Sequence, residues 1–85
     1  MSLRLRADVS TTATDDGLVL LDERAGRYWQ LNPTGAYVLS VLLNGATPAQ
    51  AAAMLADQYA ISVDQATGDV TALVDQLRAA GLIAG

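Results

Sequence analysis

The densest group of side chains that could recognise a ligand is the segment 27–31, which reads Arg27-Tyr28-Trp29-Gln30-Leu31 and holds two of the four aromatic residues. In an extended segment, alternate residues share a face. Arg27, Trp29 and Leu31 would then point one way, and Tyr28 and Gln30 the other. Two aromatic rings and Arg27 thus concentrate on one short piece of backbone. The alternative is that Trp29, and even more so Leu31, are core residues beneath a helix.

The side chains that usually catalyse reactions are missing or scattered. The absence of Cys and His excludes thiol and imidazole catalysis, disulfides, zinc fingers and His-based metal sites. The nine acidic residues form no calcium-loop pattern and have no His or Lys beside them. The glycines form neither phosphate-binding pattern, GxGxxG or GxxxxGK. We therefore expect no enzyme activity, no metal and no cofactor.

Size and charge narrow the class of protein further. The chain has 85 residues, which predicts a single domain over 1–85. Five Arg against nine acidic residues give a net charge of −4, which disfavours binding to a nucleic-acid backbone. The first residues lack the apolar region of a signal peptide, and no apolar run approaches the ~18 residues of a membrane span. We expect a cytoplasmic protein with no nucleic-acid or membrane partner.

Three strands are predicted in the first part of the chain. Apolar residues alternate with polar ones over 3–9, which indicates a first strand, and the Thr- and Asp-rich stretch 10–16 is interpreted as a loop or a frayed strand end. The apolar run 17–22 predicts a second strand. A short connection ending in Gly26 predicts that 27–31 pairs antiparallel to it.

Three helices are predicted to follow. Each start is an N-cap pattern, namely Asn32-Pro33, Thr47-Pro48 and Ser62-Val63. The first helix is expected to stop at Asn44-Gly45, the second near residue 59 and the third at Gly81, in a Schellman motif. Gly68 inside the third helix indicates a delayed start or a bend. Three strands before three helices predict an α+β domain of the winged helix-turn-helix type.

This order of elements leaves two kinds of binding partner. If the strands pair in sequence order, 27–31 is an edge strand, and its free backbone groups could pair with an added peptide. The last two helices could instead form a DNA-binding helix-turn-helix. The third helix, however, carries three Asp and only one Arg, which disfavours a DNA-binding regulator.

The segment 18–45 resembles the PqqD family, whose members recognise precursors of ribosomally made, modified peptides (RiPP recognition elements). The similar residues are Leu-Leu-Asp at 20–22, the run 26–32 and Asn44-Gly45, and Leu-x-x-x-Gly-Leu-Ile at 77–83 extends the resemblance over nearly the whole chain. Its most specific part is the aromatic pair followed by Leu31-Asn32.

The resemblance implies a non-catalytic binder of leader peptides. The leader would add as a strand antiparallel to 27–31, with its side chains in a groove between that strand and the third helix. Arg27 and Asp69 could pair with charges of the leader. The strand residues of the site would be Arg27, Tyr28, Trp29, Gln30 and Leu31, and the helix wall Ala66, Asp69, Val70, Leu73, Val74 and Leu77.

The short chain is most similar to the separate leader-binding proteins of lasso peptide systems. That similarity implies two partner enzymes, a cysteine-protease-like leader peptidase and an ATP-dependent macrolactam synthetase, and a leader with a Tyr-x-x-Pro pattern. The alternative is a PqqD-like peptide chaperone for a radical-SAM maturase, and the sequence does not separate the two.

Overall fold

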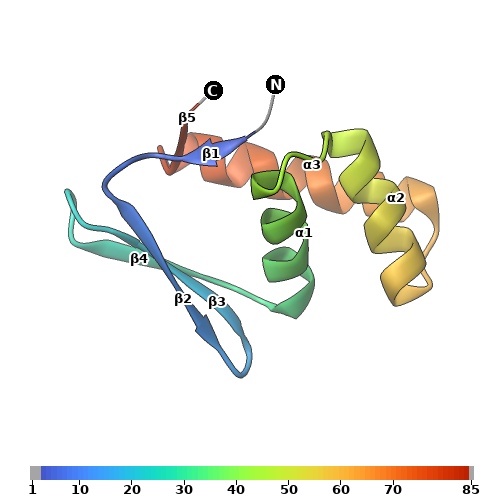
Figure 1. The fold of residues 1–85 in the computed structure, drawn as a ribbon, viewed down its shortest axis with the longest axis horizontal. Helices are drawn as coiled ribbons and strands as arrows, with labels where there is room; N and C mark the ends of the chain where they lie inside the picture. The colour runs from blue at the N-terminus through green and yellow to red at the C-terminus, as the bar shows by residue number, and fades with distance from the viewer. Residues whose placement is uncertain (1–2, 85) are drawn as a thin grey trace.

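A three-stranded antiparallel sheet is followed by three helices, which confirms the predicted α+β class. The computed structural model describes residues 3–84. Figure 1 shows α1 between the sheet and α2, while α3 extends past α1 as far as β5. Within residues 3–84, no helix is both long and apolar enough to cross a bilayer. The elements are β1 (Arg4–Leu5), β2 (Val9–Thr14), β3 (Gly17–Asp22), β4 (Arg27–Leu31), α1 (Pro33–Leu43), α2 (Pro48–Tyr59), α3 (Val63–Ala79) and β5 (Ile83–Ala84).

The first strand lies elsewhere than predicted. The sheet order is β2-β3-β4, and β2 is formed by Val9–Thr14, most of which the sequence indicated as a loop or a frayed strand end. The predicted strand 3–9 is broken, because its Arg4–Leu5 part pairs with β5 at the other end of the chain. β-branched Thr residues suit a strand, and five of the six residues of β2 are exposed, so no apolar alternation marks it. The strands 17–22 and 27–31 are confirmed.

The predicted helix ends are confirmed by their hydrogen bonds. The Asn32, Thr47 and Ser62 side chains each accept a bond from the backbone amide three residues later. At the end of α3, the Leu82 amide donates to the Leu77 carbonyl and Gly81 has φ +72°, which is a Schellman motif. Because α3 begins at Val63 and continues through Gly68, the delayed start is wrong.

The core lies between one face of the sheet and the helices. Leu20 in β3 is fully buried against the buried side of α1, and cross-strand pairing places Trp29 and Leu31 on the same sheet face as Leu20 and Leu18. Val19 and Leu21 belong to the opposite face. The largest fully buried side chains are Leu20, Leu39, Leu42, Leu55, Leu82, Val38 and Val70.

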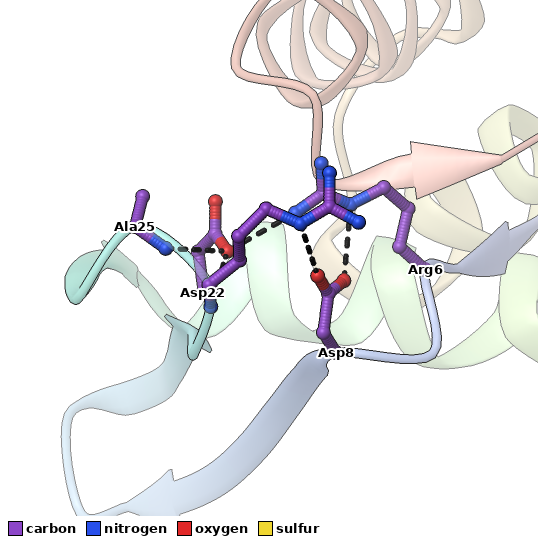
Figure 2. A network of polar contacts seen from close by, with 5 residues as sticks. Arg6, Asp8, Asp22 and Ala25 are labelled. Atoms are coloured by element: carbon purple, nitrogen blue, oxygen red, sulfur yellow. Dashed lines mark hydrogen bonds and ion pairs between the residues drawn. The ribbon is translucent and has the colours of Figure 1, made fainter.

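A polar network fixes the turn that joins β3 to β4 (Figure 2). Asp22 is only 7% exposed, and its Oδ1 accepts bonds from Arg6 Nη2 at 3.0 Å and from the amides of Arg24 and Ala25 at 3.2 and 3.3 Å. Asp8 forms an ion pair with Arg24 Nε at 3.0 Å. Asp8 also lies 3.3 Å from Arg6 Nε, but this second contact lacks the geometry of a hydrogen bond. The segment before β2 is thereby tied to the end of β3 and to the β3–β4 turn.

The Asp22→Ala change is expected to lower the free energy of unfolding by about 2 kcal/mol, because it leaves a half-buried guanidinium and two turn amides without their acceptor. Urea denaturation measures the effect. The matched control is Glu23→Ala, which removes an exposed carboxylate of the same turn. Equal losses in the two variants would show that the network contributes nothing beyond its charge.

Candidate functional site

β4 is an edge strand, as predicted. It pairs with β3 on one side, and no further strand of the sheet follows it among residues 3–84. Side chains 27–30 are exposed and Leu31 is half-buried. Part of the β4 backbone therefore faces outward and could pair with an added chain.

A groove of about 320 Å³ opens beside the end of β4. β4 and the first turns of α1 form one side of it, α3 forms the other, and Leu55 of α2 contributes to its lining. Four of the lining side chains are large and apolar, namely Leu31, Val38, Leu55 and Leu73, and the others are small or polar. The complete lining consists of Gln30, Leu31, Asn32, Thr34, Gly35, Val38, Leu55, Asp69, Ala72, Leu73 and Gln76.

The α3 side of the groove differs in part from the predicted helix wall. Asp69 and Leu73 line the groove, as do Ala72 and Gln76, which the sequence reasoning missed. The positions 69, 72, 73 and 76 follow the spacing of one helix face. Ala72 and Gln76 give a weak signal in the sequence, because alanine and glutamine are common on any solvated helix face.

Three predicted wall residues lie in the core and do not line the groove. Ala66, Val70 and Leu77 are 0%, 1% and 3% exposed and belong to the core. The most regular apolar positions of an amphipathic helix are those that face its own core. The groove residues lie beside that stripe. Val74 is half-buried and packs against the core rather than lining the groove.

The aromatic part of β4 lies outside the groove lining. Trp29 is 37% exposed and Tyr28 is 74% exposed. The guanidinium of Arg27 lies over the Trp29 ring, 5.7 Å from its centroid, which is the geometry of a cation–π contact. Arg27 and Trp29 share the strand face of Leu31 and therefore extend the candidate surface from the groove along the strand, whereas Tyr28 lies on the opposite face.

The groove rim at the start of α1 is held rigidly. Asn32 Oδ1 accepts bonds from the Gly35 amide at 2.8 Å and from Thr34 Oγ1 at 2.9 Å. A Cβ on Gly35 would lie 3.2 Å from that same oxygen, so the glycine permits the close approach. Helix capping and groove formation thus use the same residues.

The comparisons with known proteins identify the family. The family model of coenzyme PQQ synthesis protein D (PqqD) matches residues 17–83, and the chain belongs to the PqqD family. The resemblance seen in the sequence is confirmed. Comparison with curated proteins gives no match.

Two solved structures are similar over the whole chain. One is a lasso peptide synthetase B1 complexed with the leader peptide, with 41% identity, a TM-score of 0.93 and full coverage of both chains. The other is TbiB1 in complex with the TbiA(beta) leader peptide, with 24% identity, a TM-score of 0.87, and coverage of 100% of this chain and 96% of that one. The similarity to the TbiB1 structure supports the fold of this chain.

Proposed function

We propose that this protein binds the leader segment of a ribosomally made precursor peptide in lasso peptide biosynthesis. The observation that carries the proposal is the open groove beside the free edge of β4. The leader would add as a strand antiparallel to β4. Alternate leader side chains would then enter the groove toward α3, while main-chain hydrogen bonds would supply much of the affinity. Family membership and the 41% identical synthetase B1 with its leader support this function.

The proposed role is recognition without catalysis. The protein would hold the leader while a cysteine-protease-like leader peptidase and an ATP-dependent macrolactam synthetase act on the precursor. In this role Arg27, Tyr28, Trp29, Gln30 and Leu31 would contact the added strand, and Asp69 and Leu73 of α3 would contact its side chains.

A direct binding assay tests the proposal. A fluorescent leader peptide of a lasso peptide precursor is titrated with the protein and followed by polarisation. A dissociation constant in the micromolar range or below, with no binding of a scrambled leader, is the expected result. Equal binding of the native and scrambled leaders would contradict sequence recognition.

Strand addition makes a further prediction about the leader backbone. An N-methyl group removes one amide donor and leaves the side chains unchanged. Because the amides of a strand alternate in direction, N-methylation at every second leader position is expected to weaken binding about tenfold, with little effect at the positions between. The measurement is polarisation with one N-methylated leader for each position. If the losses of affinity do not alternate from one leader position to the next, strand addition is ruled out.

A further inference from the structure

The groove contains a single ionisable side chain. Of the lining residues only Asp69 carries a charge, and it lies one helical turn before Leu73 on the same face of α3. The other polar residues of the groove are neutral, namely Gln30, Asn32, Thr34 and Gln76. A groove with apolar lining residues and one carboxylate therefore favours a cationic over an anionic ligand side chain.

This carboxylate has no counter-ion among residues 3–84. Among residues 3–84, the ion pairs join Arg6 and Arg24 to Asp8 and Asp22, and none includes Asp69. In the free protein Asp69 is exposed, so water solvates it. A peptide lying in the groove would displace part of that water, and the carboxylate would then need a new hydrogen-bond donor. A cationic side chain is the strongest such donor.

We propose that Asp69 is a specificity-determining residue that selects leaders with a Lys or Arg side chain in the groove. The inference rests on the proposed function and adds the chemistry of the ligand. Because alternate residues of an added strand share a face, this cation stands an even number of residues from the apolar side chain that enters the groove. An acidic leader residue at the same position is rejected, since it would face Asp69 at close range.

A charge scan of the leader tests the inference. Each position of the fluorescent leader is replaced in turn by Lys and by Glu, and each peptide is titrated against the unchanged protein. At one position the Lys peptide is expected to bind at least about tenfold more tightly than the Glu peptide. With Asp69→Lys the preference at that position reverses.

Asp75→Lys is the matched control. Asp75 is also an exposed acid on α3 but does not line the groove, so the variant makes the same change in net charge away from the ligand. The preference is expected to persist in this variant. The inference is overturned if the Lys-over-Glu preference reverses at no leader position in Asp69→Lys. It is also overturned if the preference reverses equally in Asp69→Lys and Asp75→Lys. In both cases leader binding itself stands. If the unchanged protein binds no leader, the proposed function fails, and the inference fails with it.

Discussion

The Ala72→Trp variant is expected to bind the leader peptide at least about 100-fold more weakly than the unchanged protein, with its melting temperature nearly unchanged. Ala72 lines the groove from α3 and is exposed, so an indole there would occupy the space proposed for leader side chains. A 100-fold loss corresponds to about 2.7 kcal/mol of binding free energy. The intrinsic helix preference of Trp costs the fold only about 0.5 kcal/mol.

The control for this variant is Ala53→Trp. Ala53 is an exposed residue within α2 and does not line the groove. The same added ring on another helix is expected to leave leader affinity within about twofold, since exposed substitutions away from a site act weakly. Polarisation gives both affinities, and thermal unfolding followed by circular dichroism shows that both variants are folded. Full leader affinity in Ala72→Trp would place the leader outside the groove.

The parts of the fold that the sequence predicts correctly are those set by local interactions. Asn32, Thr47 and Ser62 cap their helices through bonds that span three residues, so their patterns can be recognised without knowledge of the fold. The β3–β4 hairpin is also local. The partner of β1 is the segment Ile83–Ala84 at the far end of the chain, and no local pattern can specify such a pairing. The alternation over residues 3–9 therefore did not distinguish β1 from the beginning of β2.

In the candidate site, too, the local part could be predicted from the sequence and the part set by tertiary packing could not. β4 could be located from its own residues, because two adjacent aromatics and an arginine follow directly after the predicted hairpin turn. The α3 side of the groove could not be located fully, since it depends on the angle at which the helix meets the end of β4. Apolar periodicity finds the stripe that α3 buries, which includes Val70 and Leu77. The groove uses the neighbouring stripe, where Leu73 is the one large apolar residue.

The Gly17→Ala variant is expected to lose about 3 kcal/mol of unfolding free energy, because it combines backbone strain with a steric clash. Gly17 has φ +143°, which L side chains rarely adopt. A Cβ there would collide with the Leu31 carbonyl oxygen and lie 3.0 Å from the Asn32 carbonyl carbon. The start of β3 therefore abuts the point where β4 passes into α1, and no flexible side chain is available to relieve the clash.

Gly68→Ala is the matched control, because it adds the same methyl group at a position where a Cβ has no neighbour within 4 Å. Gly68 lies inside α3, so alanine is expected to stabilise the protein by about 1 kcal/mol. Urea denaturation of the two variants should then give changes of opposite sign. Since Leu31 and Asn32 also line the groove, Gly17→Ala is expected to weaken leader binding in its folded fraction, and Gly68→Ala is not. Similar changes in stability would mean that the close contact between β3 and the end of β4 does not constrain the fold.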